Sequence, residues 1–448
     1  MRRALAAAGA LAALVSVGGA AAEGGGEPGG HGLTLRTTTR SDVRAFASGP
    51  ARAAATWCGS ASTEDRSPNA VAGHPVHWVY AIPSDGADRL AELANAMQTD
   101  AEQIDAWWRS QDTARAPRND VTQFPCGLQL DITTVRMAET GAQLAPLSGR
   151  FAAVFNTLGA ARLRSSFTKY VVYYDGPVSD TEVCGQGASD PSGLGLAVVY
   201  FQSCVGVSTA AVGAHELLHT FGAVARGAPN ECPESSGHTC DDSNDLMYPS
   251  IDDAPLSAKS LDPGRNDYYG HGGSWPDAQD SAWLVHLDNQ APLALTMSGP
   301  GAIASDVPGL VCSQSCATTW NAGTRLALTA TPGPGARLVR WGSPCAGASG
   351  CTVTVSSGSS VSALFAPASF RLTVSVSGRG AVRSTQPGIT CRPRCSGTFP
   401  SYSPVTLVAT PAKGWRFRSW RGGCRGAKRS CRVPMTAVTS ARAVFVRI

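Results

Sequence analysis

The sequence has few charged residues and lacks a long apolar run beyond its first 22 residues. Charged residues make up 16% of the 448 positions, and the formal net charge is only +4. Such values are untypical of a disordered polyelectrolyte, and a hydrophobic fraction of 43% without repeated apolar runs is untypical of a polytopic membrane protein. We therefore expect a water-soluble protein of about two to four domains, at roughly 100 to 200 residues per domain.

The N-terminal sequence and the cysteine content both indicate an extracellular protein. Two arginines precede an apolar stretch, and Ala20-Ala21-Ala22 provides an A-x-A cleavage site. We expect residues 1–22 to be a signal peptide cleaved near Ala22, with an uncleaved membrane anchor as the alternative. Residues 23–50 begin with EGGGEPGGHG and are expected to form a flexible leader. The 14 cysteines are an even set, which is typical of secreted proteins with disulfide bonds.

The C-terminal part of the chain contains an internal duplication, in which residues 292–367 align with residues 369–448. Between shared landmarks the sequence alternates as in strands and is interrupted by Gly and Pro turns. We expect two small all-β modules, each with disulfide bonds among its own four cysteines. These cysteines are Cys312, Cys316, Cys345 and Cys351 in the first copy, and Cys391, Cys395, Cys424 and Cys431 in the second.

The second copy differs sharply from the first in charge. Residues 369–448 contain fifteen Lys or Arg residues and no Asp or Glu, which leaves a net charge of −11 for residues 1–368. This module is expected to be attracted to anionic cell-wall or surface polymers, although its arginines could instead only solvate a small domain. No motif for specific nucleic-acid binding is present. On residues 414–417 (GWRF) and 420–424 (WRGGC), the module resembles cysteine-bearing repeats appended to many secreted bacterial proteins.

Residues 208–224, with the sequence STAAVGAHELLHTFGAV, have the apolar pattern of a buried helix. His215 and His219 are four residues apart, so their imidazoles project from one face and can bind a single Zn²⁺. Glu216 lies next to the first histidine, where its carboxylate can take a proton from a metal-bound water and pass it to a leaving amine. This is the H-E-x-x-H pattern of zinc peptidases; an ordinary buried helix is the alternative.

Two further features resemble the metzincin family. Gly222 follows the second histidine by three residues, as in H-E-x-x-H-x-x-G-x-x-H. The segment Asp245-Leu246-Met247-Tyr248-Pro249 resembles the methionine turn of that family, particularly the matrixin form. The resemblance implies an α+β zincin-like catalytic domain with a mixed sheet. It also implies that Met247 forms an apolar floor beneath the zinc, and that Tyr248 and Pro249 form one wall of the substrate's primed-side pocket.

The sequence departs from this family at the third zinc ligand, because Ala225 occupies the expected position and cannot bind a metal. We expect His238 to replace it, since a neutral imidazole matches the other two ligands. A loop closed by Cys232 and Cys240 would hold it with little loss of entropy on binding. The remaining candidate ligands are Asp241, Asp242 and Asp245, of which the first two are the principal alternative. A Ca²⁺ site in this acidic string is a further alternative.

Residues 51–290 have the mixed pattern expected of such a catalytic domain. The expected strands are residues 77–82, 128–137, 170–174 and 196–201, and the expected helices are residues 87–109 and 148–158. Six cysteines remain for this domain, and one of their fifteen connectivities pairs Cys58 with Cys126, Cys184 with Cys204 and Cys232 with Cys240.

The sequence thus predicts a secreted zinc-dependent endopeptidase with one catalytic zinc ion and Glu216 as its general base. The alternative is an extracellular adhesion or cell-wall-binding protein, in which the β modules bind a surface and the zinc fold is structural or degenerate. Ala225 favours the alternative. The intact glutamate favours the peptidase, because a structural zinc site needs no general base. Neither a substrate nor a cysteine-switch propeptide can be recognised in the sequence.

Overall fold

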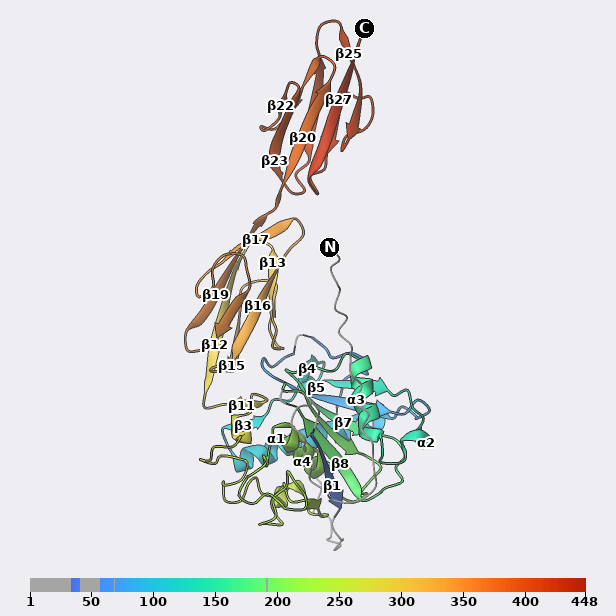
Figure 1. The fold of residues 1–448 in the computed structure, drawn as a ribbon, viewed down its shortest axis with the longest axis vertical. Coiled ribbons are helices and arrows are strands. Elements are labelled where there is room, and N and C mark those ends of the chain that lie inside the picture. The colour runs from blue at the N-terminus through green and yellow to red at the C-terminus, as the bar shows by residue number, and fades with distance from the viewer. Residues whose placement is uncertain (1–33, 41–56, 68, 191) are drawn as a thin grey trace, which may run out of the picture. The chain divides into compact units, whose positions relative to one another are not determined.

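The computed structural model describes residues 34–40, 57–67, 69–190 and 192–448 (Figure 1). The expected signal peptide, residues 1–22, lies outside the described residues. The chain divides into two compact units. The first contains the chain up to Ala291 with residues 307–310 and 319–324, and the second contains residues 292–306, 311–318 and 325–448. Among the described residues, no helix is both long and apolar enough to cross a membrane.

A mixed seven-stranded sheet forms the centre of the N-terminal unit (Figure 1). Across the sheet, its strands are β10 (Ser250–Ile251), β1 (Thr34–Arg40), β8 (Val183–Ser189), β9 (Gly195–Tyr200), β7 (Lys169–Tyr174), β2 (Val76–Ile82) and β6 (Ile132–Arg136). Strands β9, β7, β2 and β6 are mutually parallel, whereas β8 is antiparallel to β9 and to β1. The central strands are fully buried, as expected for a sheet covered on both faces.

Helices cover the two faces of this sheet. Trp78 and Tyr80 of β2 pack in one apolar cluster with helices α1 (Leu90–Gln111) and α4 (Thr209–Thr220). Val79 and Ala81 pack in the other cluster, with α3 (Arg150–Ala160) and α2 (Gly141–Leu144). Because successive side chains of a strand point to opposite faces of the sheet, those of β2 are divided between two cores.

Shorter elements complete the N-terminal unit. Strands β3 and β11 form one two-stranded sheet, and β4 and β5 form another. The bounds of the short elements are β3 (Arg115–Pro117), β4 (Val121–Phe124), β5 (Gly127–Leu130), β11 (Leu284–His286), and the 3-10 helices η1 (Leu256–Ala258) and η2 (Ala278–Asp280).

The sequence correctly predicted several elements but not the whole sheet. The strands expected at 77–82, 170–174 and 196–201 are β2, β7 and β9, and the expected helices are α1 and α3. The strand expected at 128–137 is divided into β5 and β6 at Asp131, whose carboxylate accepts a backbone hydrogen bond from Arg66. Part of the expected flexible leader is also a strand: residues 34–40 form β1. That segment, TLRTTTR, is rich in β-branched threonine, which favours extended structure.

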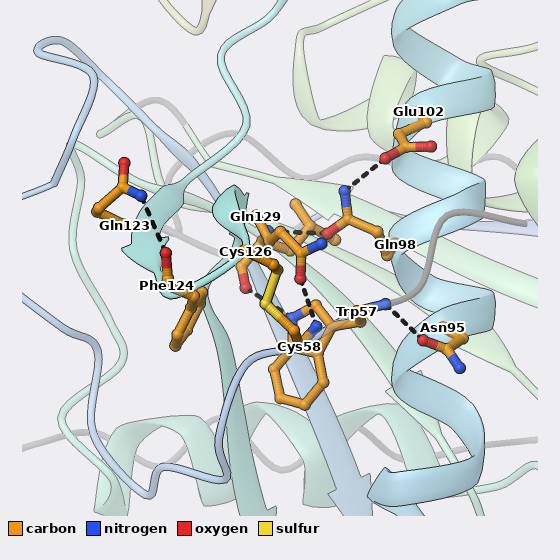
Figure 2. The surroundings of a disulfide bond; sticks show 10 residues. Trp57, Cys58, Asn95, Gln98, Glu102, Gln123, Phe124, Cys126 and Gln129 are labelled. Atoms are coloured by element: carbon orange, nitrogen blue, oxygen red, sulfur yellow. Dashed lines mark hydrogen bonds between the residues drawn. A yellow bond between two sulfur atoms is a disulfide. The ribbon is translucent and has the colours of Figure 1, made fainter.

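A disulfide bond between Cys58 and Cys126 joins the segment before β2 to the turn between β4 and β5 (Figure 2). Next to it, the backbone N–H of Trp57 donates to Asn95 Oδ1 of α1 at 2.6 Å. The backbone N–H of Cys58 donates to Gln129 Oε1 of β5, also at 2.6 Å. Residues 57 and 58 are therefore held against both a helix and a strand. The structure also pairs Cys184 with Cys204 and Cys232 with Cys240.

The repeat region consists of two β modules with the same topology, each with two four-stranded sheets. The sheets of the first are β15 (Cys316–Asn321), β12 (Gln290–Ser298), β19 (Ser359–Pro367), β17 (Ala336–Trp341), and β14 (Val311–Cys312), β13 (Gly301–Ser305), β16 (Arg325–Pro332), β18 (Cys351–Thr354). Those of the second are β23 (Arg394–Pro400), β20 (Ser369–Ser377), β27 (Thr439–Arg447), β25 (Trp415–Gly422), and β22 (Thr390–Cys391), β21 (Gly380–Ser384), β24 (Val405–Pro411), β26 (Ser430–Val433).

Each module contains two disulfide bonds between cysteines that are close in sequence, as the duplicated cysteines predicted. The pairs are Cys312–Cys316, Cys345–Cys351, Cys391–Cys395 and Cys424–Cys431. The all-β, disulfide-bonded character of the repeat modules is therefore confirmed.

Replacing both Cys58 and Cys126 with serine should lower the free energy of unfolding of the N-terminal unit by about 2–4 kcal/mol, because the bond closes a 68-residue loop and constrains the unfolded chain. Hydrogen exchange of β2 and β7 as a function of urea measures this loss. The control removes the Cys391–Cys395 bond, which closes only four residues in the second repeat module. Equal destabilisation of β2 and β7 by both changes would contradict the expectation.

Candidate metal centre

Helix α4 begins and ends at the residues that its sequence indicates. Ser208 is the N-cap, and its side chain accepts a hydrogen bond from Ala211 N at 3.2 Å. Gly222 lies just beyond the C-cap with a φ of +85°, in the left-handed region that favours glycine. The helix packs on β8 and β9, and all residues from Ala210 to Thr220 are buried.

The structure brings His215 and His219 of α4 together with His238 of the following loop. Their ring centroids are 4.8 Å apart for His215 and His219, 5.2 Å for His215 and His238, and 4.9 Å for His219 and His238. One ring nitrogen of each lies within 4.8 Å of the others. All three side chains are buried, with at most 4% of each residue exposed. These are the three histidines that the sequence analysis named as candidate zinc ligands, and together they could hold a metal ion.

Hydrogen bonds at the far side of two rings indicate which nitrogens face the centre. His215 Nδ1 lies 2.5 Å from the carbonyl oxygen of Leu246, which can only accept, so Nδ1 carries the proton. His238 Nδ1 lies 3.2 Å from the carbonyl oxygen of Ser235. Burial and the neighbouring His238 ring hold the pKa of His215 well below its usual value, so this ring is neutral. Its lone pair is therefore on Nε2.

His215 Nε2 provides a direct test of whether a metal fits. It is buried and has no hydrogen-bond partner within the described part of the chain. A buried nitrogen with an unused lone pair is costly unless something binds it. Three converging imidazoles are a ligand set of catalytic zinc sites, and a backbone carbonyl that accepts from the other ring nitrogen, as Leu246 does for His215, orients such a ligand. The residues therefore fit a zinc ion.

A loop closed by a disulfide bond holds His238 in place. The Cys232–Cys240 disulfide closes the loop, and the backbone N–H of Cys232 donates to the carbonyl of His238 at 2.8 Å. One residue further, Thr239 N donates to the carbonyl of Met247 at 2.9 Å. The loop is thus joined to the segment expected to be a methionine turn. Met247 is fully buried, and Tyr248 and Pro249 are half-buried and lead directly into β10.

Asp245 stabilises this junction and is not part of the histidine cluster. Its carboxylate accepts hydrogen bonds from Thr239 Oγ1 at 2.8 Å, Tyr268 Oη at 2.6 Å and Met247 N at 2.9 Å. Burial raises the pKa of Asp245 to about 7. The three donors tie the loop of His238, the turn at Met247 and the later chain to one carboxylate.

The other acidic candidates also lie outside the cluster. Asp241 Oδ2 accepts a hydrogen bond from Asn230 Nδ2 at 3.0 Å, and Asp242 Oδ1 accepts one from Asn244 N at 2.8 Å. The second contact, between residues two apart, is typical of a turn. In the described residues, the string from Asp241 to Asp245 does not bring three possible ligand atoms together.

Glu216 fills a space that two glycines of β8 leave open. The glutamate is fully buried. A Cβ atom on Gly185 would lie 2.6 Å from Glu216 Oε1, and one on Gly187 would lie 2.9 Å from Oε2. Such approaches are too close, so β8 can pass next to this carboxylate only with glycine at both positions. The sequence analysis missed these residues; the pair of glycines inside the strand VCGQGAS was the available signal.

Asp100 of α1 anchors the start of α4 and was also missed. Its Oδ2 accepts hydrogen bonds from Thr209 Oγ1 at 2.6 Å and from Tyr173 Oη of β7 at 2.7 Å. Burial raises the pKa of Asp100 to about 6, although both hydroxyl donors act in the opposite direction. The contact joins α4 to α1 and to the sheet.

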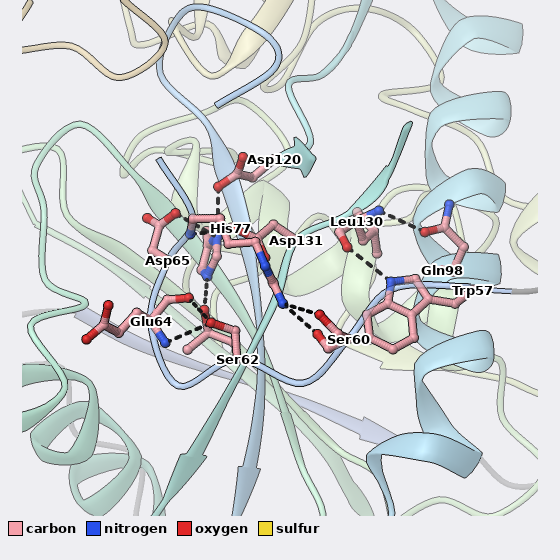
Figure 3. A network of polar contacts seen from close by, with 12 residues as sticks. Trp57, Ser60, Ser62, Glu64, Asp65, His77, Gln98, Asp120, Leu130 and Asp131 are labelled. Atoms are coloured by element: carbon pink, nitrogen blue, oxygen red, sulfur yellow. Dashed lines mark hydrogen bonds and ion pairs between the residues drawn. The ribbon is translucent and has the colours of Figure 1, made fainter. Parts of the chain in front are cut away.

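A second buried cluster contains Asp65, His77, Asp120 and Asp131 (Figure 3). His77 lies between Asp120 Oδ2, at 2.9 Å from Nδ1, and Thr133 Oγ1, at 2.8 Å from Nε2. Burial alone would lower the pKa of His77, but the hydrogen bond and the charge of Asp120 raise it. Arg66 forms an ion pair with Asp131. His77 and Arg66 thus face three carboxylates in a buried network of hydrogen bonds and ion pairs.

Comparison with known proteins identifies the repeats. Residues 303–369 and 374–448 match the family described as the divergent InlB B-repeat domain. This match confirms the repeat modules and does not extend to the histidine cluster. No curated protein matches the chain.

Similarity to solved structures is weak. The Bacillus anthracis TIE protein is 8% identical, with a TM-score of 0.25 over 37% of this chain and 35% of that chain. The major pilin T-13 of Streptococcus pyogenes is 10% identical, with a TM-score of 0.18 over 36% and 97%. A catalytically inactive OgpA from Akkermansia muciniphila, in complex with an O-glycopeptide, is 12% identical, with a TM-score of 0.24 over 77% and 90%. The chain thus spans about a third of the TIE protein, and similarities at this level support no inference about function.

Asp100→Asn should flatten the pH dependence of stability. Because the pKa of Asp100 in the folded state is raised, the folded chain binds this proton more tightly than the unfolded chain. The contribution of this proton to the free energy of unfolding is present below about pH 4 and is lost as the pH rises through about 6. The total loss is about 3 kcal/mol. Urea unfolding between pH 4 and pH 7.5 measures the slope, with Asp105→Asn on the same helix as the control. An unchanged slope in Asp100→Asn would contradict the assignment.

Proposed function

We propose that the N-terminal unit is a zinc-dependent endopeptidase, in which His215, His219 and His238 hold the metal and Glu216 is the general base. The observation that carries this proposal is the convergence of three buried imidazoles, two from α4 and one from the following loop. A buried glutamate, Glu216, lies next to His215 on α4. A mixed sheet followed by the metal-binding helix is the layout that a zincin-like domain requires. The turn at Met247, joined to the His238 loop, supports the same interpretation.

The chemistry follows from the position of each residue. A zinc ion bound by the three histidines would polarise a peptide carbonyl and make a water molecule more acidic. Glu216 would take the proton from the attacking water and pass it to the leaving amine. Because Glu216 is fully buried beneath β8, bulk water does not compete for its carboxylate. The carbonyl of Leu246 keeps the His215 imidazole in the tautomer that can bind a metal through Nε2.

Glu216→Gln should retain zinc but lose about 100- to 10,000-fold of the hydrolysis rate, which is the usual contribution of a general base. His238→Ala should lose both zinc and activity. Zinc content by mass spectrometry and cleavage of casein measure the two effects, both on the full chain and on the chain cut within residues 43–49. His271→Ala is the matched control, because that side chain stacks on Trp275 at 4.6 Å and lies outside the histidine cluster. Retention of zinc in His238→Ala, or full activity in Glu216→Gln, would contradict the proposal.

A second candidate function is attachment to an anionic surface through the second repeat module. The observation that favours it is that all fifteen Lys and Arg residues of residues 369–448 are exposed, with no acidic residue among them. The match to the divergent InlB B-repeat domain fits a module appended to a surface or secreted protein. In this role, the repeats would keep the protein at a polyanionic wall or membrane. This function is compatible with catalysis in the N-terminal unit.

The full chain should be retained on a dextran sulfate column and be released by salt. Replacing Arg416, Arg418 and Arg421 with glutamate should lower the salt concentration needed for release, because all three are exposed on β25. The matched control carries the same three changes at Arg325, Arg337 and Arg340 in the first module. An equal shift in both variants would show that the second module has no particular role.

A further inference from the structure

Strand β1 occupies an unusual place in the sheet, between β8 and β10 (Figure 1). It runs antiparallel to β8, with Thr34 opposite Ser189 and Thr38 opposite Gly185. It runs parallel to β10, with Thr39 opposite Ser250. In sequence, β1 precedes every other described element, and it comes from the segment that was expected to be a leader.

Both neighbours of β1 belong to the candidate metal centre. The two glycines of β8 that make room for the Glu216 carboxylate are register partners of β1: Gly185 lies opposite Thr38, and Gly187 lies opposite Arg36. On the other side, β10 follows Tyr248 and Pro249 without a break. Helix α4 contacts β1 as well. The strand therefore passes along the metal centre between two of the elements that form it.

Without β1, strand β8 would be the outer strand of the sheet. An outer strand presents a row of backbone N–H and C=O groups, which is a ready site for an added extended peptide. The two-residue strand β10 would bind such a peptide on its other side, as it now binds β1. The groove between β8 and β10 therefore accepts a chain in extended conformation, and residues 34–40 are the chain that the structure shows in it.

We propose that residues 34–40 occupy the peptide-binding groove of the metal centre and block it, so that the full chain is latent until this segment is displaced or removed. The consequence for catalysis rests on the proposed peptidase function. The binding of an extended segment between β8 and β10 does not. If β1 were instead a permanent structural strand, removing it would unfold the unit and would create no binding site.

The test weakens β1 within the full chain. Consecutive N–H groups of a strand point to opposite sides, so the double change Arg36→Pro and Thr37→Pro removes at least one N–H donor towards β8. The control, Thr37→Val with Thr38→Val, keeps β-branched residues and the backbone donors. The probe is a fluorescein-labelled peptide with the sequence of residues 33–42, LTLRTTTRSD, and its binding is measured by fluorescence anisotropy with and without added zinc.

The proline variant should bind the peptide at least about tenfold more tightly than wild type or the valine control, because the competing segment no longer fills the groove. Amides of β8 should exchange faster in the proline variant and become protected again when the peptide binds. Equal binding by all three proteins, or loss of the fold in the proline variant as measured by near-ultraviolet circular dichroism, would overturn the proposal.

A second form of the protein avoids any change within β1. A specific protease site placed in residues 43–49 allows the folded chain to be cut, and excess labelled peptide should then replace the released segment. Failure of the peptide to enter the cut protein would also overturn the proposal. If the opened forms bind the peptide but hydrolyse nothing, the peptidase function is wrong and the groove assignment stands. If wild type and opened forms hydrolyse casein equally, latency is wrong and the peptidase function stands.

Discussion

The hydrogen bond from His215 Nδ1 to the carbonyl of Leu246 is the contact on which the proposed metal centre depends. It fixes the tautomer of the first imidazole and leaves Nε2 available. It also joins α4 to the turn that contains Met247, two segments separated by about thirty residues of chain. Because this carbonyl is a backbone group, the sequence at position 246 can vary without loss of the contact. The geometry of the site is therefore set by the path of the main chain.

Asp245 and the Cys232–Cys240 disulfide extend this constraint to the third histidine. The carboxylate binds the turn and the loop at once, and the disulfide limits the conformations of the loop before any metal is bound. In the proposed centre the third imidazole comes from a loop closed by a disulfide bond, whereas the family that the sequence resembles uses a residue three positions after the glycine of its motif. Residue 225 can then be alanine.

The residues of the site differ in how far the sequence could predict them. The spacing of His215, Glu216 and His219 was enough to predict that they share one helix. His238 was predicted because its imidazole matches the other two and because a disulfide closes its loop. The roles of Asp100 and Asp245 depend on partners distant in sequence, such as Tyr173 and Tyr268, which no local pattern indicates. Strand β8 was missed because its glycines lower its strand propensity. Strand β1 was missed because its pairing is set by an edge formed about 150 residues later.

The central claim is that three histidines of this chain hold a zinc ion, and X-ray absorption at the zinc edge of the zinc-loaded full chain tests it most directly. The account predicts one tightly bound zinc per chain, with three imidazole nitrogens at about 2.0–2.1 Å and an oxygen atom as the fourth ligand. A spectrum with two imidazoles and carboxylate ligands would contradict the role of His238. Absence of tightly bound zinc would contradict the account as a whole.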